Sequence, residues 1–262
     1  MKICLLQMDM EFEKNNKNYQ KVEKEIKKMQ AEKLDVIVLP ETWSTGFFPK
    51  ENLEEYSEKN GNKIREEFSK LALRNDVNII GGSIVNKKDK GIYNTSFIFN
   101  RKGECIASYD KIHLFSPMNE DNFFKSGNQI VTFELDGILC GIIICYDLRF
   151  LELIRTLALK GIKILFVVAQ WPESRIEHWK LLNRVRAIEN QIFVVAVNSC
   201  GKVDDTIFGG HSLVVDPWGE VITELSENEE FKMVKIDLNK LNEIRNKMSI
   251  FNDRKPFLYK IN

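Results

Sequence analysis

The sequence predicts a single mixed α/β domain over residues 1–262, built from two similar halves. Three observations predict this class. The length of 262 residues fits one large α/β domain, and 44% of the residues are hydrophobic, as a folded core requires. Short apolar runs alternate with segments of helical periodicity along the chain. No stretch rich in Pro, Gly or Ser divides these segments into separate units.

Apolar runs rich in Val and Ile predict the strands. Their apolar residues are continuous rather than alternating, which is typical of sheets that helices cover on at least one face. The runs span residues 3–8, 35–40, 78–82, 138–145, 163–170, 192–199 and 211–216.

Four segments between these strands carry apolar residues at helical spacing, which predicts one helix each. The predicted apolar faces are Tyr19, Val22, Ile26 and Met29; Ile64, Phe68 and Leu71; Leu151, Ile154, Leu157 and Ala158; and Trp179, Leu182, Val185 and Ile188.

Three further segments are predicted to be hairpins, because a turn signal separates two apolar stretches in each. They are residues 94–109, 133–139 and 212–225. The order along the chain is therefore strand–helix units, then paired strands, then strand–helix units again, then more paired strands. Residues 238–262 form a polar tail with scattered aromatic side chains, and they could pack on a neighbouring molecule or back on their own domain.

The charge balance argues against two classes of partner. Lys and Arg number 38 and Asp and Glu number 38, whereas proteins that bind nucleic acid or anionic membranes are usually basic. No apolar run approaches the ~20 residues that span a bilayer, and the N-terminus does not resemble a signal peptide. We therefore expect a cytoplasmic protein without nucleic-acid or membrane partners.

The five cysteines predict neither a disulfide framework nor a metal site. Their number is odd, no CxxC pair occurs, and no cluster of His completes a zinc site. Nucleotide cofactors are also unsupported, because the chain has no GxGxxG after a strand and no GxxxxGK[ST]. We expect neither a metal nor an organic cofactor. We also expect that the protein resides in a reducing compartment.

Glu41 and Cys145 each follow a predicted buried strand. Ligands bind at the carboxyl ends of strands in open α/β sheets, so both positions are candidate site residues. Cys145 precedes a helical segment, and a helix N-terminus is expected to lower the pKa of its thiol. The next backbone N–H, that of Tyr146, could bind an oxyanion. The alternatives are a solvent-exposed turn for Glu41 and a buried core thiol for Cys145.

Lys111 follows the first predicted hairpin, where a fixed ammonium could stabilise an oxyanion. From the residues alone, a surface lysine paired with Asp110 is the more common case. No Ser–His–Asp site competes, because the chain lacks a GxSxG motif. A Cys–His pair stays open, although none of the histidines stands in a strongly marked loop.

Three blocks of this sequence resemble the signature blocks of the nitrilase superfamily of carbon–nitrogen hydrolases, in the same order and at the same spacing. They are Leu39-Pro40-Glu41, the stretch YDKIHL over residues 109–114, and the stretch CYDLRF over residues 145–150. The resemblance runs nearly end to end. It implies a four-layer αββα sandwich in which Glu41, Lys111 and Cys145 converge, with Glu120 as a second glutamate. It also implies a homodimer of such sandwiches, with residues 238–262 as a strap.

Two segments of the chain look like those of the omega-amidase branch of the family. They are Glu41-Thr42-Trp43-Ser44-Thr45-Gly46-Phe47 and Ala169-Gln170-Trp171-Pro172. Gln170 stands where that branch usually has Asn. The resemblance implies cysteine-dependent hydrolysis of a half-amide of a dicarboxylate, such as 2-oxoglutaramate, with release of ammonia.

An omega-amidase must also bind a carboxylate. Arg149 is the candidate, because a guanidinium binds a carboxylate bidentately. An internal ion pair of Arg149 with Asp147 or Glu152 is the alternative. Trp171 and Phe47 are expected to form an apolar wall, and Tyr146 completes the predicted substrate-binding set.

Three other functions stay open. The first is another amidase of the family, acting on a carbamoyl amine, a deaminated peptide or an aliphatic amide. The second is a non-catalytic module, against which the presence of Cys145, Glu41 and Lys111 argues. The third is a nucleotide-binding α/β protein, which would lack its glycine motif.

Overall fold

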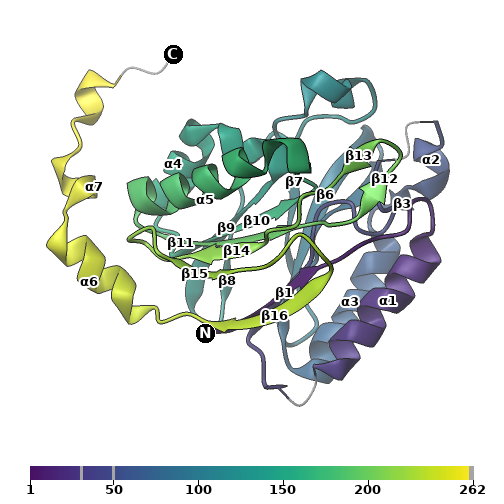
Figure 1. The fold of residues 1–262 in the computed structure, drawn as a ribbon, viewed down its shortest axis with the longest axis horizontal. Coiled ribbons are helices and arrows are strands. Elements are labelled where there is room, and N and C mark those ends of the chain that lie inside the picture. The colour runs from purple at the N-terminus through teal and green to yellow at the C-terminus, as the bar shows by residue number, and fades with distance from the viewer. Residues whose placement is uncertain (30–31, 49–50, 260–262) are drawn as a thin grey trace.

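The computed structural model describes residues 1–29, 32–48 and 51–259, which fold into four layers: helices, sheet, sheet, helices (Figure 1). Helices α1 (Asn15–Lys28) and α3 (Asn62–Asn75) cover the outer face of the first sheet. Helices α4 (Leu151–Leu159) and α5 (Ile176–Asn190) cover the outer face of the second sheet. The predicted αββα sandwich is confirmed.

The first sheet has eight strands, most of them from the first half of the chain. Their order is β16–β1–β2–β4–β6–β5–β3, and β7 pairs with β6. Strands β1, β2 and β4 run parallel, so their carboxyl ends lie at one edge. The bounds are β1 (Lys2–Gln7), β2 (Val36–Val38), β3 (Glu58–Lys59), β4 (Asn78–Ile80), β5 (Ile84–Lys88), β6 (Gly91–Phe99), β7 (Cys105–Asp110) and β16 (Glu230–Lys235).

The second sheet has six strands in the order β15–β14–β11–β10–β9–β8. Its central strands β9, β10 and β11 are parallel, and their carboxyl ends also share one edge. The bounds are β8 (Thr132–Leu135), β9 (Ile138–Ile144), β10 (Ile164–Ala169), β11 (Phe193–Asn198), β14 (Leu213–Val215) and β15 (Val221–Glu224). Outside both sheets, β12 (Lys202–Val203) and β13 (Thr206–Ile207) form a short hairpin, and α2 (Leu53–Tyr56) is a single turn.

The continuous apolar runs are explained by burial on both faces of each sheet. In β1, Ile3 and Leu5 belong to the core between the sheets, whereas Cys4 and Leu6 pack toward α1 and α3. This alternation follows the two-residue period of a strand. Burying each aliphatic side chain of this size stabilises the fold by about 1.5–3 kcal/mol.

The structure contains every predicted strand, helix and hairpin, but two predicted helix faces are wrong in part. Leu151 of α4 is 49% exposed, and Ile188 of α5 is 44% exposed. The buried face of α5 includes Asn183, Arg186 and Asn190 instead. The side-chain NH2 groups of the two asparagines donate to backbone carbonyls one turn earlier, which satisfies these donors inside the core.

Strand β16 was not predicted. It pairs antiparallel with β1 and forms the edge of the first sheet. Its sequence is half charged, with Glu230, Lys232 and Lys235, and most of its residues are partly or fully exposed. Charged residues of this kind are common on edge strands and hide the strand from an apolar pattern search.

The tail packs back on its own domain over its first half. In α6 (Asn239–Lys247), Leu241 and Ile244 are buried, and the Arg245 guanidinium donates to the carbonyl oxygen of Gln191 at 3.1 Å. Helix α7 (Ile250–Asp253) follows α6 along the side of the second helix layer, where the Arg155 guanidinium of α4 lies 5.5 Å from the Phe251 ring centroid (Figure 1). Beyond it, Phe257, Leu258 and Tyr259 are exposed. No helix among the described residues is both long and apolar enough to cross a bilayer.

Candidate active site

Glu41 lies between the two sheets. It follows β2 through Leu39 and Pro40, and it is 4% exposed. Its carboxylate accepts hydrogen bonds from the Asn94 side-chain amide at 2.8 Å and from the Gln170 N–H at 2.8 Å. Its own N–H donates to the carbonyl oxygen of Ala169 in the second sheet at 3.4 Å. The alternative of a solvent-exposed turn is therefore wrong.

Lys111 follows β7 directly, and its side chain is 3% exposed. Its Nζ lies 2.9 Å from Glu41 Oε1 and 2.9 Å from Glu120 Oε2. Burial alone would lower the pKa of Lys111, but the carboxylates of Glu120 and Glu41 outweigh burial and raise it well above its usual value. The ammonium is therefore charged, and it is not the surface lysine that the residues alone suggested.

Glu120 begins the short helix η3 (Glu120–Asn122) and is also 3% exposed. Its carboxylate accepts the Phe115 N–H at 2.6 Å, besides both contacts with Lys111 Nζ. Glu41, Lys111 and Glu120 form a buried carboxylate–ammonium–carboxylate set, which we call the charged trio.

Cys145 stands at the junction of β9 and the helix η4 (Cys145–Arg149). Its φ of 46° lies in the left-handed region, which costs a non-glycine residue roughly 1–2 kcal/mol. Its Sγ lies 4.0 Å from the carbonyl oxygen of Gln170. Because Tyr146 is the second residue of η4, its N–H has no acceptor within that helix.

The expected lowering of the Cys145 pKa is wrong. Burial raises the pKa of the thiol well above its usual value, and the charge of Glu41 raises it further. Lys111 acts in the opposite direction but is outweighed. The carboxylates of Glu41 and Glu120 would repel a thiolate at this position, and the single ammonium of Lys111 does not offset both. The resting group is therefore the neutral thiol.

Asp147 was not predicted as a site residue, although it belongs to the CYDLRF block. It is fully buried, and it accepts the N–H of Ile144 at 3.0 Å and the hydroxyl of Tyr109 at 2.7 Å. It also accepts the backbone N–H of His113 at 2.9 Å. Asp147 thereby ties the turn that carries Cys145 to the segment that carries Lys111.

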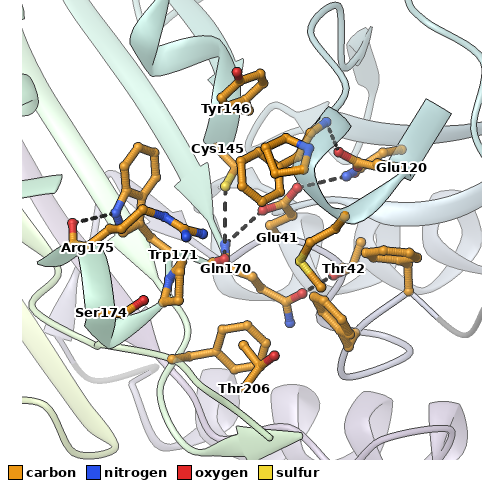
Figure 2. A pocket seen from close by; sticks show the side chains of 18 of the residues that line it. Glu41, Thr42, Glu120, Cys145, Tyr146, Gln170, Trp171, Ser174, Arg175 and Thr206 are labelled. Carbon is orange, nitrogen blue, oxygen red and sulfur yellow. Dashed lines mark hydrogen bonds between the residues drawn. The ribbon is translucent and has the colours of Figure 1, made fainter. Parts of the chain in front are cut away.

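All eight predicted site residues line one cavity of about 390 Å³. They are Phe47, Glu41, Lys111, Glu120, Cys145, Tyr146, Arg149 and Trp171. Figure 2 shows Cys145 in the middle of this cavity, with Glu120 on one side and Trp171 on the other. The volume lies at the lower end of the range for small-molecule sites, about 300–1,000 Å³. Asn94 and Arg175 also line the cavity and were not predicted.

Arg149 does not form the internal ion pair that was the alternative to substrate binding. Within the part of the chain that the structure describes, it pairs with neither Asp147 nor Glu152. Its guanidinium lies 4.8 Å from the Trp171 ring centroid, and its Nη2 is 3.3 Å from His178 Nδ1.

The histidines take no part in a Cys–His pair among the described residues. His113 contacts Asp147, His178 contacts Arg149, and His211 contacts Glu224. The same described residues contain no group of three or more His, Cys, Asp or Glu side chains placed to hold a metal ion. The site therefore consists of a thiol, a carboxylate beside it and a fixed ammonium, which suits acyl transfer.

Comparisons with known proteins agree with this chemistry. The family model described as carbon-nitrogen hydrolase matches residues 2–246. A 2-oxoglutaramate amidase of Bacillus subtilis is 40% identical over 257 residues, covering 98% of each chain. The human omega-amidase NIT2 is 33% identical over 236 residues, covering 86% of this chain and 85% of its own.

A solved structure is similar over the whole chain. The crystal structure of Saccharomyces cerevisiae Nit3, a member of branch 10 of the nitrilase superfamily, superposes with a TM-score of 0.89 at 28% identity. The match covers 99% of this chain and 97% of that one. The similarity extends across all four layers of the sandwich.

Proposed function

The chain belongs to the carbon-nitrogen hydrolase family, and from that premise we propose that it hydrolyses the terminal amide of a small dicarboxylic half-amide such as 2-oxoglutaramate. One observation carries the proposal: the charged trio converges beside the Cys145 thiol in a cavity of small-molecule size. The similarity to a 2-oxoglutaramate amidase and to omega-amidases supports this substrate class.

The first half of the reaction forms a thioester. Glu41 accepts the proton of the Cys145 thiol, and the sulfur attacks the amide carbonyl carbon. Lys111 and the Tyr146 N–H stabilise the oxyanion. Protonated Glu41 then gives its proton to the amide nitrogen, the carbon–nitrogen bond breaks, and ammonia leaves.

The second half releases the acid. Glu41 accepts a proton from water, and the hydroxyl attacks the thioester carbonyl while Lys111 and the Tyr146 N–H again hold the oxyanion. The carbon–sulfur bond breaks, and Glu41 returns its proton to the sulfur. The net reaction is amide and water to carboxylic acid and ammonia. We propose that Glu120 assists in this half and holds Lys111 in place.

The rest of the cavity would accommodate the substrate's chain and its carboxylate. Phe47 and Trp171 would form an apolar wall along the methylene groups. Arg149 would contribute positive charge on the side where the carboxylate lies. An amidase of the same family with a carbamoyl, deaminated-peptide or aliphatic substrate is the alternative, and release of carbon dioxide together with ammonia would identify the carbamoyl case.

The test is ammonia release from 2-oxoglutaramate by the wild type and by Cys145→Ala. We expect steady release from the wild type and a loss of about 10⁴-fold or more in the variant, because removing a nucleophile leaves only the background of the site. Equal far-UV circular dichroism spectra would show that the variant folds. No release from the wild type would contradict the proposed function.

Assembly and location complete the proposal. We propose a homodimer whose contact involves the exposed apolar side chains Leu151 of α4 and Leu181 and Ile188 of α5, with residues 238–262 as a strap. We also propose that residues 1–262 act as one domain in the cytoplasm, where the free cysteines would stay reduced. Size-exclusion chromatography with light scattering tests the dimer.

A further inference from the structure

We propose that Arg175 binds the substrate's distal carboxylate and is the residue that makes the enzyme select half-amides over neutral amides. This inference rests on the proposed function and names the group that would give it its specificity. Arg175 comes from a polar stretch without periodicity, and it lines the same cavity as Cys145.

The backbone of Arg175 belongs to one wall of the cavity. It is the last residue of the helix η5 (Glu173–Arg175). Its carbonyl oxygen accepts a hydrogen bond from the Trp171 indole N–H at 2.8 Å, which Figure 2 marks. Its N–H donates to the carbonyl oxygen of Pro172 at 3.1 Å. These bonds fix the point from which the side chain leaves.

The guanidinium of Arg175 reaches the opposite wall. It lies 5.1 Å from the ring centroid of Phe115, whose N–H donates to the Glu120 carboxylate. The side chain therefore extends from the segment after β10 to the loop that carries Phe115 and Glu120. An arginine stacked on an aromatic ring keeps its N–H edges available for an anion in the plane of the guanidinium.

The N–H edges of the Arg175 guanidinium have no partner within the described residues. The Arg175 guanidinium forms no hydrogen bond or ion pair there, although it is half-buried in the cavity lining. Arg186, by contrast, donates to the Leu148 carbonyl oxygen and pairs with Glu189. A positive charge that lines a binding cavity without an anion is complementary to a ligand that brings one.

The two other cations of the cavity are less available. Lys111 Nζ is already bound by Glu41 and Glu120. The Arg149 guanidinium has one face on Trp171, and its Nη2 lies against His178. We infer that Arg149 adds to the positive potential, whereas Arg175 makes the direct contact.

The charges also set the direction in which the substrate lies. The two carboxylates of the charged trio would repel the carboxylate of a half-amide from the vicinity of Cys145. Arg175 would attract it to its own guanidinium instead. The neutral amide would then lie against the thiol, as the reaction requires.

The experiment compares Arg175→Gln with the wild type on 2-oxoglutaramate and on pentanamide, a neutral amide of the same chain length. We expect kcat/KM on 2-oxoglutaramate to fall about 10- to 100-fold, since hydrogen bonds to charged groups are of that strength. The loss should lie chiefly in KM. Pentanamide should lose far less, so the ratio of the two kcat/KM values should fall by a similar factor.

Three companion variants sharpen the result. Arg175→Lys should recover part of the preference, because it restores the charge without the bidentate geometry. Arg149→Gln should reduce the preference less than Arg175→Gln does. Arg74→Gln is the matched control, because Arg74 is exposed at the end of α3, outside the residues that line the cavity.

Two outcomes would overturn the inference. One is an unchanged substrate preference in Arg175→Gln. The other is an equal loss on both substrates, chiefly in kcat, which would assign Arg175 a structural role. A wild type without activity on 2-oxoglutaramate would instead contradict the proposed function, so the two failures are distinguishable.

Discussion

The charged trio and the turn that carries Cys145 meet in one cavity, but they are held in opposite ways. Glu41, Lys111 and Glu120 each form two or more hydrogen bonds at 3.0 Å or less, and all three are almost fully buried. Cys145 has a left-handed backbone, and its Sγ lies as far as 4.0 Å from the Gln170 carbonyl oxygen. The charges are fixed, whereas the reactive atom is held loosely.

This difference matches what each part must do in the proposed reaction. Charges that stabilise an oxyanion act best when they are in place before the reaction, because no reorganisation is then needed. The sulfur must form and break a bond to carbon in every cycle, so strong hydrogen bonds to it would be lost each time. The predictions below test this contrast.

The largest effect is expected for Lys111→Met. It leaves the carboxylates of Glu41 and Glu120 buried without a cation, and breaking a buried ion pair in this way costs about 3–5 kcal/mol of stability. Lys88→Met is the matched control, because Lys88 pairs with Asp110 at 2.6 Å but is 30% exposed, and it should cost about 1 kcal/mol or less. Urea denaturation measures both, and similar losses in the two variants would contradict the contrast.

The second-largest effect is expected on stability at alkaline pH and concerns the Cys145 thiol. Since burial and Glu41 raise the pKa of Cys145 above its unfolded value of 9.0, the unfolded chain loses this proton first. The thiol's contribution is complete below pH 9 and is lost as the pH rises toward the folded pKa. The stability difference between wild type and Cys145→Ala should therefore shrink above pH 9, by at most about 1.4 kcal/mol per pH unit.

A resting thiolate would give the opposite sign. Its lowered pKa would stabilise the wild type above the unfolded pKa, and that stability would disappear as the pH falls. Thermal unfolding of both proteins from pH 6 to pH 11 distinguishes the two cases.

The smallest effect is expected for Tyr109→Phe, which removes one of the hydrogen bonds to Asp147. The loss should be about 1 kcal/mol of stability, because Asp147 keeps its bonds from Ile144 and His113. Activity should fall modestly, since Asp147 joins the turn that carries Cys145 to the segment that carries Lys111. A loss as large as that of Lys111→Met would show that the turn and the trio are held equally tightly.

The sequence predicted the parts of the site that stand at strand ends. Glu41 follows β2 and Cys145 follows β9, and a polar residue after a long apolar run is visible without a structure. Lys111 and Glu120 needed the resemblance to a family, because a lone lysine or loop glutamate carries no signal of burial. Asn94 begins the polar run Asn94-Thr95-Ser96 in β6, so nothing in its local sequence set it apart as a site residue.

Other features could not be predicted from apolar patterns. The buried face of α5 carries Asn183 and Asn190, whose amides bond to the helix backbone, so burial there does not follow hydrophobicity. Arg175 has no periodic context, and its reach to Phe115 depends on tertiary structure. Strand β16 is specified by its pairing with β1 rather than by its own sequence.

The bond between the Gln170 N–H and the Glu41 carboxylate joins the second sheet to the first at 2.8 Å. Hydrogen exchange at this one amide would therefore report a local opening between the sheets that need not involve global unfolding. Such an opening would free Glu41 from its position beside Cys145 while both helix layers stay intact. Heat should then inactivate the protein at a lower temperature than it melts the helices, and activity would serve as the more sensitive measure of how firmly the sheets are joined.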